Sequence, residues 1–273
     1  MTNEILAYYS STDEKDRLAA DFSLERIRTQ EIILRYLPPT PVNLIDIGGA
    51  AGVYSFWLAD QGHQVTLVDL TPKHIEQARQ VNQTAWRRLA GIQEGNACNL
   101  QFAPGTFDVA LLLGPVYHLL DRPLRVKALH EALRVLKPGG LLFVAAISRF
   151  ASLFDGFKRG LVADERFQSI LDHDLKTGDH HNSTDNPGYF TSAHFHLVPE
   201  LRDEIADAGA SVLSLLAVEG AANCIPDVEE RLKDTGYRAY LLEKLRQTET
   251  EPSLLGASSH LIAVIEKPRT EPK

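Results

Sequence analysis

The sequence is poor in cysteine, in basic residues and in long apolar runs. Only Cys98 and Cys224 occur among 273 residues, without CxxC spacing, so neither a disulfide scaffold nor a Cys/His zinc site is expected. Acidic residues outnumber basic ones, 36 to 28, which disfavours a broad nucleic-acid-binding face. No apolar run is long enough to cross a bilayer, and the N-terminus does not resemble a signal peptide. We therefore expect a cytoplasmic protein without membrane association.

Strands and helices alternate through much of the chain. An apolar run typical of a strand buried on both faces lies at residues 42–47, and a further buried strand is expected at residues 107–113. Other strands are expected at residues 64–69, 91–94 and 140–147. Helical patterns lie between them at residues 52–61, 71–89 and 124–136, and upstream at residues 13–37. The C-terminal third adds helical patterns at residues 199–208 and 228–249 and strands at residues 211–218 and 260–267. This order predicts an α/β fold with a doubly wound, mostly parallel sheet.

Residues 149–198 interrupt that alternation. The segment is rich in aromatic residues, glycine and histidine, and shows no clean periodicity. A long irregular segment inside a compact fold is usually functional or disordered rather than a plain connection. We therefore expect residues 149–198 to form a substrate lid, inserted into a core made by residues 42–148 and 199–268.

A glycine-containing turn, DIGGAAG at residues 46–52, joins the first predicted strand to the first helix of the core. Glycine allows a tight turn and close approach of a ligand, and ligands of open α/β sheets bind at the carboxyl ends of the strands. Asp69 ends the second strand, where a carboxylate can accept hydrogen bonds from both hydroxyls of a ribose. The dinucleotide fingerprint GxGxxG fails, because it would need glycine at Ala50 and Val53. A purely structural turn remains an alternative.

The turn resembles the DxGxGxG loop of class I S-adenosylmethionine (SAM)-dependent methyltransferases of the ubiquinone/menaquinone-biosynthesis type, with Ala50 replacing the middle glycine. Three further stretches follow in the order of that family: GNA at residues 95–97, FDVALLLGPVYHL at 107–119 and LRVLKPGGLLFVA at 133–145. The resemblance covers about residues 42–147. It implies a Rossmann-like, seven-stranded sheet whose last strand is antiparallel and lies beside the fifth. It also implies that residues 1–41 form helices that cap the cofactor.

The same resemblance implies a SAM site, with S-adenosylhomocysteine (SAH) as product. Asp69 matches the ribose carboxylate, and Asn96, which replaces the family's aspartate, can still bond the adenine through its side-chain oxygen. Arg28 could reach the SAM carboxylate, with a solvated helix charge as the alternative. The cofactor residues expected from the resemblance are Asp46, Gly48, Gly49, Ala50, Gly52, Asp69, Leu70, Asn96, Ala97, Leu113 and Arg28.

Methyl transfer requires alignment of the acceptor, exclusion of water and in some cases removal of a proton. His118 and Tyr117 follow the fourth strand directly and are the candidate catalytic residues, although a packed histidine at the start of a helix is an equally simple interpretation. The predicted substrate residues are Tyr9, Arg149, Tyr189, His194 and His196. Tyr8, next to Tyr9, could also close over the site.

His194 and His196 would share one face of an extended segment. Together with His180 and His181 they could in principle hold a metal. No flanking cysteine or carboxylate spacing supports such a site, so no metal is expected.

These features favour a SAM-dependent methyltransferase that modifies an oxygen, nitrogen or carbon of a small-molecule acceptor, as a monomer or homodimer. One alternative is a tRNA methyltransferase acting on a wobble-uridine carboxyl group, because the C-terminal part loosely resembles such enzymes and Arg87-Arg88 supply cations. The acidic balance and the lack of an RNA-binding module disfavour it. A non-catalytic SAM-binding protein is a further alternative, suggested only by the departures at Ala50 and Asn96.

Overall fold

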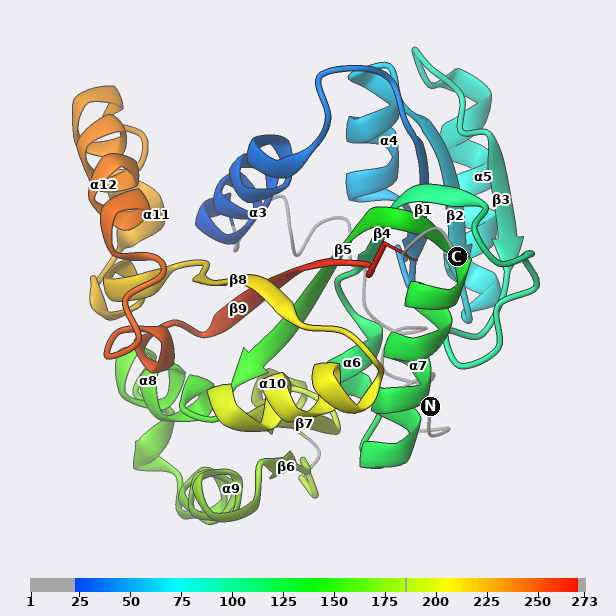
Figure 1. Cartoon of the computed structure of the whole chain (residues 1–273). Coiled ribbons are helices and arrows are strands. Elements are labelled where there is room, and N and C mark those ends of the chain that lie inside the picture. Colours follow the sequence, from blue (N-terminus) through cyan, green and yellow to red (C-terminus); the bar gives the residue numbers. More distant parts are fainter. Residues whose placement is uncertain (1–22, 185, 270–273) are drawn as a thin grey trace.

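A central sheet organises the protein in the computed structural model, which describes residues 23–184 and 186–269. Seven of its strands lie in the order β3-β2-β1-β4-β5-β9-β8. The parallel ones are β1 (Asn43–Ile47), β2 (Gln64–Asp69), β3 (Gly91–Glu94), β4 (Phe107–Leu112) and β5 (Leu136–Ser148). Strand β9 (His260–Glu266) runs antiparallel between β5 and β8 (Val212–Ala217). The expected seven-stranded, mostly parallel sheet with an antiparallel last strand is therefore confirmed (Figure 1).

Both faces of the sheet are covered by helices. Helices α3 (Ser23–Tyr36), α4 (Val53–Asp60) and α5 (Pro72–Thr84) contribute to one buried cluster, and α7 (Arg122–Val135) and α10 (Val198–Asp207) to the other. Strand β1 shows the alternation directly, because Leu44 belongs to the first cluster whereas Ile45 and Ile47 belong to the second. Each such buried side chain contributes about 1.5–3 kcal/mol of hydrophobic stabilisation. This two-sided burial explains the nearly continuous apolar runs in the sequence.

The described residues of this segment, 149–184 and 186–198, which we call the insert, form several helices and strands, so the expectation of an irregular segment is wrong. They form α8 (Ala151–Lys158), α9 (Glu165–Thr177), β6 (Asp179–His180) and β7 (Ala193–His196). Strand β7 extends the sheet by pairing in parallel with the last residues of β5, and β6 pairs antiparallel with β7. Figure 1 shows α8, α9 and β6 together at one end of the molecule. Helix α9 buries Phe167, Ile170 and Leu171 at helical spacing.

Two helix boundaries also differ from the sequence-based expectation. Helix α5 ends at Thr84 rather than near residue 89, and the side chain of Asn82 then accepts a hydrogen bond from the amide of Leu89 (2.8 Å). The polar stretch 228–249 divides into α11 (Val228–Arg231) and α12 (Thr235–Thr248), because Asp234 caps the second helix by accepting from the amide of Tyr237.

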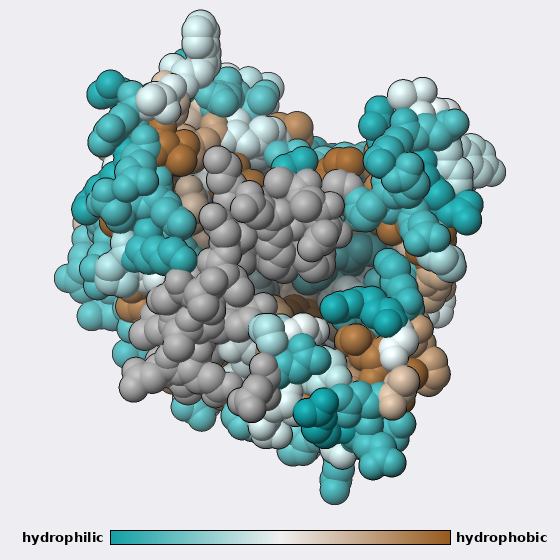
Figure 2. Space-filling model, turned by 180° about the vertical axis from the view of Figure 1, so that it is seen from behind, coloured by the Kyte–Doolittle hydropathy of each residue, from teal (hydrophilic) through white to brown (hydrophobic). Residues whose placement is uncertain are grey.

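The surface drawn in Figure 2 is mostly hydrophilic, and apolar residues occur on it in small groups between the polar ones. The most exposed large apolar side chains of the described residues include Trp86, Phe157 and Tyr240, which lie on different elements of the chain. No helix of the described residues combines the length and the hydropathy needed to cross a membrane.

A buried ion pair joins α7 to α10 on the second face of the sheet. Arg125 donates to both carboxylate oxygens of Glu204, with distances of 2.7 to 3.1 Å, and both residues are almost fully buried. Burial alone would raise the pKa of Glu204, but hydrogen bonds from His196 and Arg125 lower it to about 2. Glu204 is therefore ionised at neutral pH and holds β7 of the insert, through His196, against the core.

Glu204→Gln is expected to destabilise the protein by about 3 kcal/mol, because it leaves the guanidinium of Arg125 buried without its carboxylate. Asp207→Asn is the matched control. It breaks the exposed 2.6 Å pair between Arg122 and Asp207 across the same two helices, and it should cost less than about 1 kcal/mol. Urea denaturation at pH 7 measures both changes. Equal losses in the two variants would contradict the assigned importance of the buried pair.

Candidate functional site

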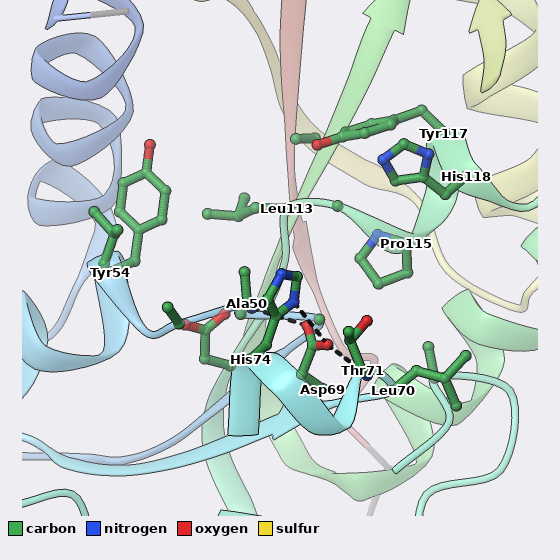
Figure 3. Close-up of a pocket in the computed structure, with 18 of the residues that line it drawn as sticks. Ala50, Tyr54, Asp69, Leu70, Thr71, His74, Leu113, Pro115, Tyr117 and His118 are labelled. Atoms are coloured by element: carbon green, nitrogen blue, oxygen red, sulfur yellow. Dashed lines mark hydrogen bonds and ion pairs between the residues drawn. The ribbon is translucent and has the colours of Figure 1, made fainter. Parts of the chain in front are cut away.

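A pocket opens at the carboxyl edge of the sheet and encloses about 1280 Å³ of empty space, its open mouth included. We call it the central pocket. Its described walls are the turn after β1, the ends of β2, β4 and β5, the loop after β3, and parts of α3, α4, α5, α6 (Pro115–His118), β8 and β9. Figure 3 shows Asp69, Thr71 and His74 grouped on one side of it, with Tyr117 and His118 on the other.

The glycines of the turn are required by packing. A Cβ added to Gly48 would lie 2.5 Å from the Pro115 ring, and one added to Gly49 would lie 2.3 Å from Leu67. Gly48 also has a φ of 74°, in the left-handed region that favours glycine. The turn therefore packs directly against β2 and α6, which fixes the floor of the central pocket.

Ala50, the residue that replaces the family's middle glycine, also adopts a left-handed conformation, with a φ of 49°. For a residue with a Cβ this conformation costs about 1–2 kcal/mol. The backbone thus keeps the shape of the glycine-rich loop although the side chain has changed. The amide of Ala50 donates to Asp69 Oδ2 (2.9 Å), and this hydrogen bond stabilises the strained backbone conformation.

Asp69 is the best-anchored acid of the site. Its Oδ2 accepts from the amide of Ala50, and its Oδ1 accepts from the amide of Thr71 (2.8 Å). The Nδ1 of His74 lies 3.2 Å from the same Oδ1. The carboxylate nevertheless belongs to the lining of the pocket, as the sequence-based hypothesis of a ribose-binding acid requires.

Asp46 lies beneath the turn and is 1% exposed. Burial raises the pKa of its carboxyl to about 6, against the lowering effect of a 2.6 Å hydrogen bond from Ser55, and the negative charge of Asp69 raises the pKa further. Asp46 is therefore a buried carboxyl that holds its proton more readily in the folded protein than in water.

Four further predicted cofactor residues line the pocket, whereas Gly52, the last glycine of the turn, is not among the lining residues. Asn96 and Ala97 line the pocket together with Leu70 after β2 and Leu113 after β4. The Oδ1 of Asn96 accepts from the amide of Cys98 (2.8 Å), so this oxygen already stabilises its own loop. The apolar side chains offer contacts suited to an aromatic base.

His118 and Tyr117 both line the central pocket, from α6. His118 is buried, its Nδ1 lies 3.4 Å from the carbonyl oxygen of Ser192, and its ring packs against Tyr117 and Phe190. Ser192 and Phe190 belong to the insert. The structure therefore brings the two candidate catalytic residues to the site and connects one of them to residues 149–198.

Arg28 does not line the central pocket. It is fully buried and donates to Glu31, Glu249 and the carbonyl of Val218. These partners correct both sequence-based interpretations, because the guanidinium is neither solvated nor directed into the pocket. Two other residues of α3, Glu25 and Thr29, line the pocket instead.

Four predicted substrate residues also lie away from the central pocket. Arg149 donates to the carbonyl of Phe195 and to both carboxylate oxygens of Glu200, and so connects the end of β5 to the insert and α10. Tyr189 donates its hydroxyl proton to Asp164 (2.7 Å) and lines a second, shallow pocket. Arg149 and Tyr189 therefore make structural contacts of the insert.

The other two, His194 and His196, share a face of β7 as expected, with ring centroids 4.6 Å apart. Burial and the neighbouring His196 lower the pKa of His194 to about 4, so His194 is neutral at pH 7. The two histidines and Glu204 can each offer a ligand atom within 4.8 Å of the others. However, Arg125 already neutralises that carboxylate.

The metal set considered from the sequence is not assembled, because both ring nitrogens of His180 are bonded to Asp174 and the carbonyl of Tyr189. Tyr8 and Tyr9 lie outside the described residues.

Several lining residues were not predicted from the sequence, among them Glu25, Thr29, Tyr54, Thr71, His74, Pro115, Val218 and His260. For His260 a signal existed. An antiparallel last strand begins at the edge where its parallel neighbours end, so the first residue of β9 had to lie at the pocket. The pairing of β9 with β5 confirms this position, since His260 lies opposite Ile147 near the end of β5.

The chain is similar to known proteins both in sequence and in fold. Residues 45–144 match a family model described as a methyltransferase domain. A ubiquinone/menaquinone biosynthesis C-methyltransferase of Zymomonas mobilis is 29% identical over 153 residues, which is 51% of this chain and 58% of that protein. The chain thus spans little more than half the length of this curated relative.

Solved structures show the same fold. A SAM-dependent methyltransferase of Methanosarcina mazei aligns with a TM-score of 0.59 at 19% identity, over 88% of this chain and 98% of that one. The 1,6-didemethyltoxoflavin-N1-methyltransferase of Burkholderia thailandensis, solved with its substrate and SAH, aligns with a TM-score of 0.57 at 15% identity, over 97% and 87%.

The fold is that of solved SAM-dependent methyltransferases. Residues 45–144 match the methyltransferase domain, and this part of the chain is similar to ubiquinone- and menaquinone-biosynthesis methyltransferases.

Ala50→Gly is expected to leave the free energy of unfolding unchanged or to raise it by up to about 1 kcal/mol, because glycine relieves the left-handed strain. Ala51→Gly is the control in the same turn. Ala51 is not among the residues with positive φ, so its replacement should cost about 0.5–1 kcal/mol. Thermal and urea unfolding decide between these outcomes, and a similar loss in both variants would refute the strain at Ala50.

Asp46→Asn should stabilise the ligand-free protein at pH 7 by up to about 3 kcal/mol, since the folded carboxyl has a pKa near 6 against an ordinary 3.8. The folded state binds the proton more tightly, so wild-type stability from this group falls as pH rises from about 4 to 6. The advantage of the variant should therefore shrink when pH is lowered from 7 to 4. Urea denaturation at several pH values measures it, and a difference independent of pH would contradict the raised pKa.

Proposed function

We propose that the protein transfers a methyl group from SAM to an oxygen, nitrogen or carbon atom of a small-molecule acceptor. One observation carries the proposal: the turn after β1, Asp69 at the end of β2 and Asn96 after β3 line a single cavity. That combination of elements is the one expected from the resemblance to class I methyltransferases. The curated relative matches only part of its own length, so the activity of the whole chain is proposed on this geometry.

The residues present suit the groups of the cofactor. Asp69 offers a carboxylate to the ribose hydroxyls, and Leu70, Ala97 and Leu113 offer apolar contacts to the adenine. At Gly48 and Gly49 the turn contributes backbone without a side chain to the pocket lining. When bound, SAM supplies an electrophilic methyl group on a sulfonium, so the protein itself must orient the acceptor and exclude water.

Within this proposal, Tyr117 and His118 orient the acceptor from the side of the pocket opposite Asp69 (Figure 3). His118 is buried and held close to Ser192, so its ring can present a fixed polar edge to an acceptor. If the acceptor loses a proton, this imidazole is positioned to receive it. Through Ser192 and Phe190 the insert supports His118, and we propose that residues 149–198 act as the substrate lid on this ground.

A small acceptor is favoured over a nucleic acid because no lysine or arginine is among the described residues that line the central pocket. Recognition of a phosphate backbone depends on such cations. The cytoplasmic location and a monomeric or homodimeric state, both expected from the sequence, complete the proposal.

Isothermal titration with SAH tests the cofactor part. The wild type should bind SAH saturably, and Asp69→Asn should weaken binding by roughly 10- to 100-fold, because a hydrogen bond to a charged group is worth about 1.5–3 kcal/mol. Asp60→Asn, an exposed change at the end of α4, is the control and should bind as the wild type does. Thermal unfolding of each variant verifies that it is folded. The proposal fails if the wild type binds neither SAH nor SAM.

A further inference from the structure

A short segment of the insert, residues 189–192, lies against His118, and side chains from elsewhere in the insert bind it. We call it the support segment. The side chains that bind it belong to three consecutive residues: His180, His181 and Asn182. None of the three is among the described residues that line the central pocket. Their route to the reaction therefore passes through the support segment.

Backbone carbonyls of the support segment receive two of these contacts. Nδ2 of Asn182 donates to the carbonyl of Phe190 (2.9 Å) and also to that of Asn186 (2.8 Å), just ahead of the segment. Nε2 of His180 lies 2.8 Å from the carbonyl oxygen of Tyr189. Two consecutive carbonyls of the segment are thus held by side chains that precede it in the sequence.

The support segment adopts a strained backbone conformation. Phe190 has a φ of 70° and a ψ of −173°, a region that is occupied almost only by glycine. Such a conformation persists where the surrounding structure holds it, and it commonly occurs at functional sites. The ring of Phe190 has its centroid 6.0 Å from that of His118 and 6.0 Å from that of His180. The strained residue therefore lies next to both the candidate base and one of the side chains that bind the segment.

The last residue of the support segment determines which nitrogen of His118 carries a proton. The carbonyl oxygen of Ser192 lies 3.4 Å from His118 Nδ1. A carbonyl accepts and cannot donate, so Nδ1 is the protonated nitrogen in this contact. In a neutral imidazole the other nitrogen, Nε2, is then the acceptor. The hydroxyl of Ser192 in turn lies 3.0 Å from Nδ1 of His181, so the residue that sets the tautomer is itself held in place.

Resting on the proposed methyltransferase function, we propose that the support segment fixes His118 as the Nδ1–H tautomer, so that Nε2 is the nitrogen that takes a proton from the acceptor. The bond between the acceptor and its hydrogen breaks, the electron pair stays on the acceptor, and the proton forms a bond to Nε2. The resulting imidazolium still donates from Nδ1 to the Ser192 carbonyl. The opposite tautomer would direct an N–H at the acceptor and could take no proton there.

In this proposal the three residues that bind the support segment are positioning residues, because they act on His118 only through the segment. Removing one of them should change the tautomer of an imidazole that it does not touch. A purely structural role in the insert would change the stability of the fold without changing that tautomer.

Long-range ¹H–¹⁵N NMR of the ligand-free protein with ¹⁵N-labelled histidine tests the proposal at pH 8.5, where an ordinary imidazole is neutral. The signals of His118 are identified by their absence from His118→Gln. The wild type should show His118 as the Nδ1–H tautomer. Asn182→Ala removes the donor to Phe190, and it should lower the ratio of the Nδ1–H to the Nε2–H form of His118 several-fold.

Gln168→Ala is the matched control. It removes another side-chain amide of the insert that donates to a backbone carbonyl, that of Val162 (2.8 Å), and it should leave the His118 tautomer unchanged. Thermal unfolding verifies that each variant is folded. If Asn182→Ala does not unfold cooperatively, Asn182→Asp replaces it, because aspartate keeps the acceptor oxygen for Thr184 and lacks only the donor.

The inference is overturned if wild-type His118 is the Nε2–H tautomer, a mixture of both or protonated on both nitrogens. It is also overturned if the Asn182 variant keeps the wild-type ratio, or if Gln168→Ala changes the ratio equally. The SAH affinity of the Asn182 variant, measured by calorimetry, should stay close to that of the wild type, because no residue of the support segment is among the described lining of the pocket. Failure of the wild type to bind SAH would defeat the proposed function separately, since the tautomer is measured without ligand.

Discussion

The carboxylate of Asp69 is the constraint on which the cofactor side of the pocket depends. One oxygen accepts from the amide of Ala50 in the turn after β1, and the other accepts from the amide of Thr71 at the start of α5. A single side chain thus fixes two loops relative to each other. The amide of Gly48 adds a 2.7 Å bond to the carbonyl of Val68 on β2, which brings the turn against the sheet. Bonds of this kind to a charged acceptor are strong, so this half of the pocket is formed before any ligand binds.

The acceptor side has a different origin, because its residues come from distant parts of the chain. Helix α3 contributes Glu25, α6 contributes His118, and β9 contributes His260. Strand order brings them together: β9 runs antiparallel beside β5, so its first residue lies where β5 ends. The insert then supports His118 through Ser192.

The sequence predicted what depends on local pattern: the strands of the core, the turn at residues 46–52 and the acid at the end of β2. The sequence-based prediction failed where the rotation of a helix about its axis decides which side chains face the pocket. Arg28 and Glu25 lie within one turn of α3, yet only Glu25 faces the pocket, and the sequence does not state how that amphipathic helix is turned. The helices of the insert were missed for another reason. They are separated by turns, so a helical spacing of apolar residues, such as that of Phe167 and Ile170, holds within one helix but not across the whole segment.

The different origins of the two sides of the pocket explain why family resemblance identifies the cofactor but not the acceptor. The family model matches residues 45–144, which contain the glycine turn, Asp69, Asn96 and His118. Glu25 and His260 lie outside that range, as does the whole insert. The glycine turn rests on backbone geometry that few residues can satisfy, because a Cβ at Gly48 or Gly49 would clash with its neighbours. Similarity to quinone-biosynthesis methyltransferases therefore bears on the methyl donor and not on the acceptor, because the pocket also includes residues outside the matched range.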